Sequence, residues 1–365
     1  MNRVYKQLPF QSTRKSLRRQ RGVTLVELMV ALALGLLITV AMLKVYVDAS
    51  GLYRFNEGLA RVQENGRFAL EFIRRDTRVA GFWGCDSDVT PNNLIDEDSS
   101  AYINVLAGHI KGLEGEEATD PDSITLRSAY GTGFLVTGDM ASTTSNIAVD
   151  PTDIEKIDFD PDDPKPLPLL ISDCHSADLF QLTGTPDSTL AHKLGDVTNT
   201  SDELNKAYLS GSRVYQVREI TYCVADGTGT DESGKPIPSL RRADGKGSAD
   251  ACETGDELLE GIENMQILYG EDTDADSDGA NGDGTANRYV AIDEDENFDV
   301  DRIVSVRLSL LVRSINDNLT TDLSPYTFPS WVNPPTLTTP TDKYLRKVFT
   351  TTITLRNKAL RNKAG

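Results

Sequence analysis

The chain has 365 residues, of which 39% are hydrophobic, and its 56 acidic residues outnumber its 37 lysines and arginines to give a formal charge of −19. This apolar content is enough for a sizeable core, and the length suggests one large domain or two modest ones. The acidic balance argues against a broad nucleic-acid footprint, which requires a basic face.

The amino terminus combines a basic segment with an apolar run. Residues 1–22 hold seven lysines and arginines and no acid, and residues 23–43 contain a single charge, Glu27. A helix over that run spans about 31 Å at 1.5 Å per residue, close to the thickness of the bilayer core. Because the cations precede the run, that end is expected in the cytoplasm and the rest of the chain outside it.

Two simpler interpretations of the apolar run are a secretory signal peptide and a plain signal anchor. The apolar region of a signal peptide is roughly 7–15 residues long and ends at a small-residue cleavage site, whereas this run is longer and continues into a helical pattern. A plain anchor leaves Glu27 unexplained, because a carboxylate inside a spanning helix costs about 2.5–3.5 kcal/mol and normally has a dedicated partner.

The helical pattern continues over residues 44–80. Apolar or small residues recur mostly three or four positions apart: Leu52, Phe55, Leu59, Val62, Gly66, Ala69, Ile73 and Ala80. This spacing predicts one helix over about residues 24–79 whose stripe packs against the chain's own head. Four glycines weaken the helix at intervals: Gly35, Gly51, Gly58 and Gly66.

The remainder, residues 81–365, is expected to form a globular head. Clusters of Asp, Pro, Ser, Thr and Gly make residues 86–210 rich in loops, with short strands such as 123–127. Apolar and β-branched patterns indicate strands over residues 213–224 and 347–356, and strict alternation predicts a half-buried strand over residues 304–313. The pattern predicts an α+β fold in which a long helix packs on an antiparallel sheet with large insertions.

Four cysteines stand in this region: Cys85, Cys174, Cys223 and Cys252. They form no CxxC pair and do not cluster with histidines at zinc spacing. Beside an export signal they indicate one or two disulfides formed in an oxidising compartment. The loop-like stretch between Cys223 and Cys252 favours that pair and leaves Cys85 with Cys174, but four cysteines allow three connectivities and the pairing stays open.

Residues 271–301 form an acidic loop with twelve carboxylates and one cation, Arg288. Asp274, Asp276 and Asp278 alternate before a glycine, as in the first half of a calcium-binding loop. The twelfth position is a threonine instead of the usual glutamate, so Asp283 or the run at 293–296 would have to complete the site. The alternative is a solvated loop without metal.

Motifs for catalysis are missing from the sequence. There is no phosphate-binding loop, nucleophile elbow or HExxH pair. We therefore expect no enzymatic activity, and no cofactor apart from the calcium ion considered for the acidic loop.

The segment Gly22-Val23-Thr24-Leu25-Val26-Glu27 resembles the processing site of type IV prepilins, in which a basic leader, a glycine and an apolar helix with glutamate as its fifth residue follow one another. The resemblance implies cleavage between Gly22 and Val23 by a membrane peptidase, methylation of the new amine on Val23, and a role for Glu27 in assembly. Valine stands where the family more often has phenylalanine, and the 22-residue leader is longer than in many major pilins.

Three later stretches, LLEGIENMQILYGEDTDADSDG, VSVRLSLLVRS and VFTTTITLRN, resemble PilW-type minor pilins. The resemblance implies a pilin-like fold and a single-pass inner-membrane precursor with a periplasmic head, which is later incorporated at the pilus tip. The implied partners are the prepilin peptidase, other minor pilins, the major pilin and the inner-membrane assembly platform. The implied function is to help start pilus assembly in a tip complex, supporting twitching and adhesion.

Two alternatives stay open. One is a J-type minor pseudopilin of a type II secretion system, which the large head and the carboxy-terminal stretches disfavour. The other is a tip adhesin or DNA receptor that uses residues 86–210, which the resemblance does not cover.

Overall fold

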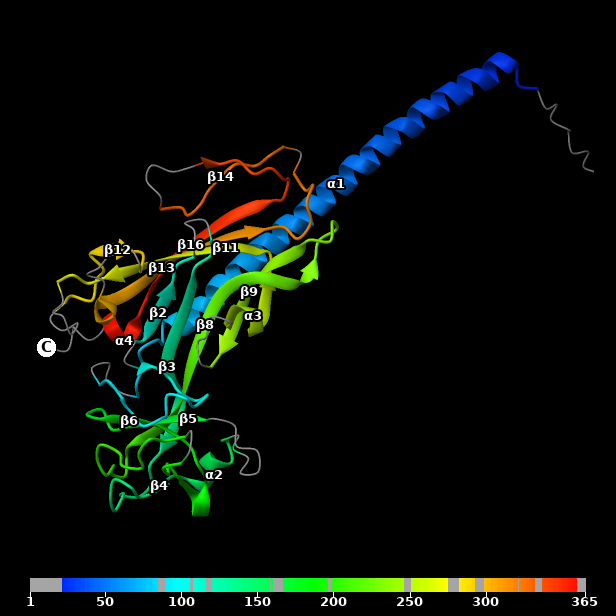
Figure 1. Ribbon diagram of the computed structural model, residues 1–365. Helices are drawn as coiled ribbons and strands as arrows, with labels where there is room; N and C mark the ends of the chain where they lie inside the picture. Colours follow the sequence, from blue (N-terminus) through cyan, green and yellow to red (C-terminus); the bar gives the residue numbers. More distant parts are fainter. Residues whose placement is uncertain are drawn as a thin grey trace, which may run out of the picture. The chain divides into compact units, whose positions relative to one another are not determined.

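The computed structural model describes residues 22–359 except for 85–88, 106–107, 116–119, 158, 160–166, 196–197, 246–250, 275–281, 293–298, 321 and 332–336. The chain divides into two compact units, residues 1–54 and 55–365. One helix, α1 (Leu25–Thr77), crosses this boundary, and both of its ends lie within two residues of the predicted ones. The second unit, residues 55–365, holds the end of α1 and a head of two main sheets (Figure 1). The predicted α+β fold, a long helix with a sheet-rich head, is confirmed.

The larger sheet has the strand order β1-β6-β5-β8-β3-β2, and β9 pairs with both β8 and β10. Its strands are β1 (Asn92–Asn93), β2 (Ile110–Leu113), β3 (Ser123–Leu135), β5 (Pro168–Ser172), β6 (Ala177–Gln181), β8 (Arg213–Thr230), β9 (Pro236–Asp244) and β10 (Asp256–Glu260). All of these pairings are antiparallel except the short one between β1 and β6.

The smaller sheet has the order β12-β11-β13-β16 and is antiparallel throughout. Its strands are β11 (Ile262–Glu271), β12 (Arg288–Val290), β13 (Ile303–Arg313) and β16 (Arg346–Thr354). The remaining elements are two short ribbons and several single turns: β4 (Ile147–Ala148) with β7 (Thr189–Leu190), β14 (Tyr326–Thr327) with β15 (Leu337–Thr338), α2 (Pro151–Ile154), α3 (Ala251–Thr254), α4 (Arg356–Ala359), and the 3-10 turns η2 (Pro186–Ser188) and η3 (Val300–Arg302).

The long strand β8 joins two parts of the head. Its first residues pair with β5, and its later residues pair with β9 along the same edge. Its other edge pairs with β3, which extends to Leu135 and is far longer than the predicted strand at 123–127. Loop-forming residues dominate the composition between 86 and 210, but this region still contributes β1 to β7. The strands β3 and β5 pair with β8, β2 and β6 pair with them in turn, and these distant partners supply hydrogen bonds that local propensity does not reveal.

One core brings α1 and both sheets together. The buried stripe of α1 contributes Val62, Ala69 and Ile73, which pack in one cluster with residues of β3, β8, β9, β11 and β13. The predicted stripe is therefore confirmed from Val62 onward, whereas Leu52 is 61% exposed. Two further clusters fill the part of the head built from residues 83–217.

The strand β13 is more buried than its alternation predicted. Ser305 and Ser309, expected on a solvent face, are 5% and 0% exposed. The Ser309 hydroxyl lies 3.1 Å from the hydroxyl of Thr350 on β16, and the Ser305 hydroxyl lies 3.1 Å from that of Tyr289 on β12. The segment that carries β14 packs on β16 (Figure 1). The prediction of a half-buried strand was wrong because the serine hydroxyls pair with hydroxyls of neighbouring strands, which allows this polar face to be buried.

The glycines of α1 differ in purpose. A Cβ atom at Gly66 would lie 2.4 Å from the ring of Phe349 on β16, and one at Gly58 would lie 2.4 Å from the Leu319 side chain. At Gly35 and Gly51 the same atom would meet nothing within 4 Å among the described residues. Gly58 and Gly66 therefore mark close approaches between α1 and the head, beyond the weakening of the helix expected from glycine alone.

Asp122 links the two sheets. Its backbone amide donates to the carbonyl of Met265 on β11 at 2.8 Å, and its carboxylate accepts from the amide of Ile267 at 2.7 Å. Burial, followed by the nearby charge of Glu114, raises the pKa of this carboxyl to about 7. The hydrogen bond from the Ile267 amide acts in the opposite direction, but burial and Glu114 outweigh it, so the folded head favours the protonated form of Asp122.

We predict that Gly66→Leu lowers the free energy of unfolding by about 1–3 kcal/mol, because the added side chain must displace the Phe349 ring from a packed site. Gly51→Leu, in the same helix, is the matched control and should leave stability unchanged or slightly raised. Urea unfolding of the full chain in detergent, followed by circular dichroism, measures both. Equal stability of the two variants would contradict the close approach.

We predict a pH dependence that Asp122→Asn removes. The folded pKa lies above the unfolded value, so the stabilisation is fully present below pH 4 and is lost as pH rises through 7. Asparagine keeps the acceptor for Ile267, so the loss of unfolding free energy between pH 5 and pH 8 should shrink by about 1–2 kcal/mol relative to the native chain. Asp98→Asn, at an exposed carboxylate, should leave the profile unchanged; an unchanged profile for Asp122→Asn would refute the assignment.

Candidate functional site

The start of α1 presents the processing and assembly residues expected from the sequence. Gly22 and Val23 precede the helix and are exposed. Thr24 caps it, because its hydroxyl accepts a hydrogen bond from the Glu27 amide at 3.2 Å and its carbonyl accepts from the Leu28 amide at 3.0 Å. Threonine followed three positions later by glutamate is a capping-box pattern, a signal that sequence reasoning did not use.

Glu27 lies in the first turn of α1. A carboxylate there is favoured by the positive end of the helix dipole. Among the described residues its side chain makes no hydrogen bond or ion pair within the chain, and it is surrounded in sequence by exposed apolar side chains such as Val26 and Leu28. A carboxylate in such a setting is costly unless another molecule supplies its partner.

The amino-terminal part of α1 is long and apolar enough to cross a membrane. Its most apolar 18-residue window has a mean hydropathy of 2.5, and none of that window is buried. Large side chains from Val23 to Val47 are more than half exposed. Burial of these side chains requires lipid or other helices.

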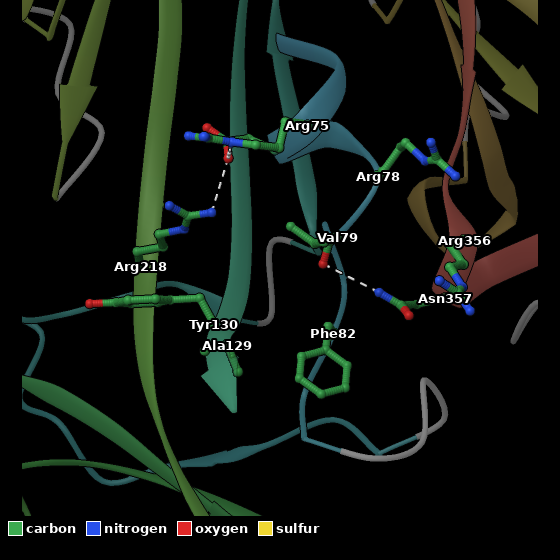
Figure 2. A pocket seen from close by; sticks show the side chains of 11 residues that line it. Arg75, Arg78, Val79, Phe82, Ala129, Tyr130, Arg218, Arg356 and Asn357 are labelled. Carbon is green, nitrogen blue, oxygen red and sulfur yellow. Dashed lines mark hydrogen bonds and ion pairs between the residues drawn. The ribbon is translucent and has the colours of Figure 1, made fainter. Parts of the chain in front are cut away.

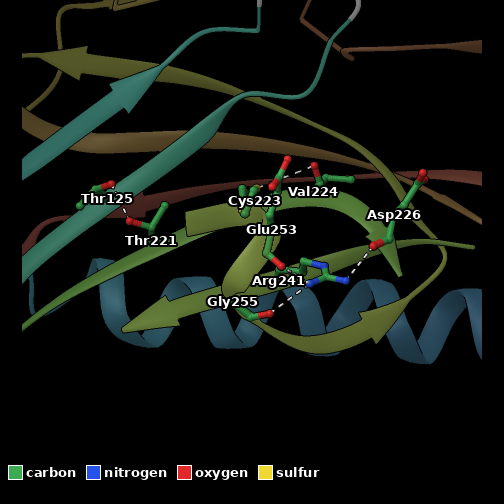
Figure 3. The surroundings of a disulfide bond; sticks show 9 residues. Thr125, Thr221, Cys223, Val224, Asp226, Arg241, Glu253 and Gly255 are labelled. Carbon is green, nitrogen blue, oxygen red and sulfur yellow. Dashed lines mark hydrogen bonds between the residues drawn. A yellow bond between two sulfur atoms is a disulfide. The ribbon is translucent and has the colours of Figure 1, made fainter. Parts of the chain in front are cut away.

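The carboxy-terminal region is crosslinked by the disulfide between Cys223 on β8 and Cys252 on α3, with Cα atoms 5.8 Å apart (Figure 3). Arg241 on β9 supports this corner by donating to the carbonyls of Asp226, Glu253 and Gly255 at 2.8–3.2 Å. The favoured pairing of these two cysteines is thus found. Cys174 is also disulfide-bonded, and Cys85, its expected partner, lies outside the described residues.

The acidic loop brings three carboxylates together. Ligand oxygens of Asp272, Asp274 and Asp283 lie within 4.8 Å of one another. Asp276 and Asp278, the other expected ligands, lie outside the described residues. Asp272 was missed as a ligand, although it begins the run of alternating aspartates; it is fully buried, and its carboxylate accepts from the amides of Asp274 at 3.2 Å and Gly284 at 2.7 Å.

Oxygen ligands of this kind suit calcium. The cluster contains Asp274 and Asp283 of the expected ligands and adds Asp272, which precedes them. Its spacing therefore departs from that of a standard calcium loop. Calcium binding therefore stays a prediction that rests on carboxylate proximity alone.

Comparison with known families points to pilus assembly. Residues 221–357 match the model described as type IV pilus-assembly protein W, and residues 17–43 match the prokaryotic N-terminal methylation motif. No curated protein and no solved structure matches the chain. The first match begins within β8 and ends in α4, so it covers the disulfide, the acidic loop and the smaller sheet.

If calcium binds the three carboxylates, addition of 1–5 mM calcium should raise the melting temperature of the full chain, whereas magnesium at the same concentration should have a smaller effect. Asp272→Asn/Asp274→Asn should abolish the calcium-dependent rise. Asp202→Asn/Asp226→Asn, with the same loss of charge, is the control. A rise that survives in the first variant would place the ion elsewhere.

Proposed function

We propose that the chain is a type IV minor pilin that is inserted in the inner membrane, processed after Gly22, and used to start pilus assembly as part of a tip complex; the matches over residues 17–43 and 221–357 support this. The observation that carries this proposal is Glu27. Its carboxylate has no partner among the described residues, and it lies in the first turn of α1, within the apolar and exposed part of the helix, four positions beyond the predicted new amino terminus. The match to a pilus-assembly protein supports this proposal over a secretion pseudopilin.

The mechanism we propose is charge pairing and helix packing. When subunits leave the bilayer, their apolar helices stack together, and the Glu27 carboxylate meets the methylated amine of Val23 on a neighbour. Each charge is costly when buried alone, and the two compensate when paired. Because only one axial offset brings them together, the pair selects the correct register during extraction from the membrane.

The orientation and partners follow from the same segment. The seven cations of residues 1–22 keep the amino terminus in the cytoplasm and place the head in the periplasm. The prepilin peptidase processes the precursor, and the inner-membrane platform, other minor pilins and the major pilin are the assembly partners. The protein performs no catalysis, and it supports twitching and adhesion indirectly by enabling pilus formation.

The test is Glu27→Ala in the native strain, with Glu232→Ala, an exposed carboxylate of the head, as the control. Mass spectrometry should find cleavage after Gly22 and an N-methylated Val23 in both variants. Electron microscopy should show at least a tenfold loss of surface pili, or of this subunit from sheared pili, for Glu27→Ala only. Assembly at the native level would contradict the pairing mechanism, and a native chain that is never cut at Gly22 would show a plain signal anchor.

A further inference from the structure

A pocket opens in the head where the end of α1 meets β3, β8 and α4 (Figure 2). Its volume is about 510 Å³, within the range of small-ligand and side-chain binding sites. Four arginines from three parts of the chain line it: Arg75, Arg78, Arg218 and Arg356. Among the described residues that line it, Asp76 is the only acidic one, so these residues carry a net charge of +3 in a chain of −19.

Asp76 is already neutralised inside the protein. It is 2% exposed, and it accepts hydrogen bonds from Arg218 at 3.0 Å and from the Tyr222 hydroxyl at 2.7 Å. The Arg218 guanidinium also lies over the Tyr130 ring, 5.0 Å from its centroid. Asp76 and Arg218 therefore form a fixed inner wall, and no other described residue of the lining is a counter-ion for the remaining arginines.

The outer arginines are available to a ligand. Within the part of the chain that the structure describes, the side chains of Arg78 and Arg356 form no hydrogen bond or ion pair, and both residues are exposed. The Arg75 side chain is 68% exposed, and its nearest acidic contact is a 3.7 Å approach to Asp76. Asn357 donates to the carbonyls of Val79 and Ala80 at 3.3 and 3.4 Å, which occupies acceptors that would repel an anion.

The wall between these arginines is apolar. It consists of Val79, Phe82, Ala129 and the ring of Tyr130, and Val79 and Tyr130 are 38% and 36% exposed. Guanidinium groups bind carboxylates in a two-pronged geometry. A ligand that satisfies both features carries a carboxylate beside an apolar group, as a short acidic peptide segment does.

We propose that this pocket binds an acidic segment, with an adjacent apolar side chain, from a neighbouring pilin subunit. The identity of the partner rests on the proposed function; the chemistry of the pocket does not. A nucleic acid is the poorer fit, because the chain's charge of −19 repels a long polyanion and the apolar wall offers nothing to a phosphate. The pocket thus provides lateral selection of a partner, separate from the axial pairing at Glu27.

The first test measures binding to the full chain in detergent. The probe is a fluorescent peptide that alternates glutamate with phenylalanine, and its glutamine counterpart is the control ligand. Arg78→Glu/Arg356→Glu should weaken binding of the acidic peptide at least tenfold, whereas Lys111→Glu/Lys193→Glu, with the same change of charge, should stay within twofold of the native chain. Unchanged melting curves should confirm that the variants fold, because neither the Arg78 nor the Arg356 side chain makes a hydrogen bond or ion pair with another described residue.

Three results would overturn the proposal: equal binding of the glutamine peptide, equal weakening by both double variants, or tighter binding of single-stranded DNA that Arg78→Glu/Arg356→Glu abolishes.

The second test counts pili in the native strain, a deletion strain and the two double variants. We expect pili to be lost in the deletion strain and in Arg78→Glu/Arg356→Glu only. Pili on the deletion strain would refute the proposed function. A deletion strain without pili, together with normal pili on the Arg78→Glu/Arg356→Glu strain, would refute the pocket contact alone.

Discussion

The head depends on one buried carboxylate at the last turn of α1. Asp76 receives hydrogen bonds from Arg218 and Tyr222, both on the central strand β8, and lies 3.8 Å from the Arg242 guanidinium on β9. A buried charge must be paired, and removal of one partner from such a group is strongly destabilising. This cluster therefore fixes the end of the helix on the strand that connects both parts of the larger sheet, and its burial raises the pKa of the Tyr222 hydroxyl.

The helix that Asp76 anchors has two chemically different halves. From Val62 onward its stripe is buried in the shared core, and Gly66 brings its backbone against Phe349. Before residue 54 its apolar side chains are exposed, and Glu27 has no partner within the described residues. Packing within the chain buries the second half, while burial of the first half requires lipid or other helices. A continuous helix thus packs into the head at one end and presents an unpacked apolar surface at the other.

Much of this organisation was predictable because it is local in sequence. The 3.6-residue stripe gave α1 within two residues of each end, and apolar and β-branched patterns gave β8, β13 and β16. The features that escaped depend on distant pairing. The length of β3 comes from β8, the burial of Ser309 from Thr350 on β16, and the inclusion of Asp272 from a turn that returns to Asp283. The arginine pocket draws on four separate segments, so no window of the sequence contains it.

Charge distribution connects these features to assembly. The head is acidic, so approaching subunits of similar charge repel it at long range unless a local patch has the opposite sign. Arg78 and Arg356 supply that patch beside the place where Asp76 holds the helix to the head. Electrostatic complementarity of this kind selects partners and orientation more than it adds affinity. In the proposed tip complex this selectivity matters most, because pilin helices would provide similar apolar surfaces and the heads would have to distinguish one neighbour from another.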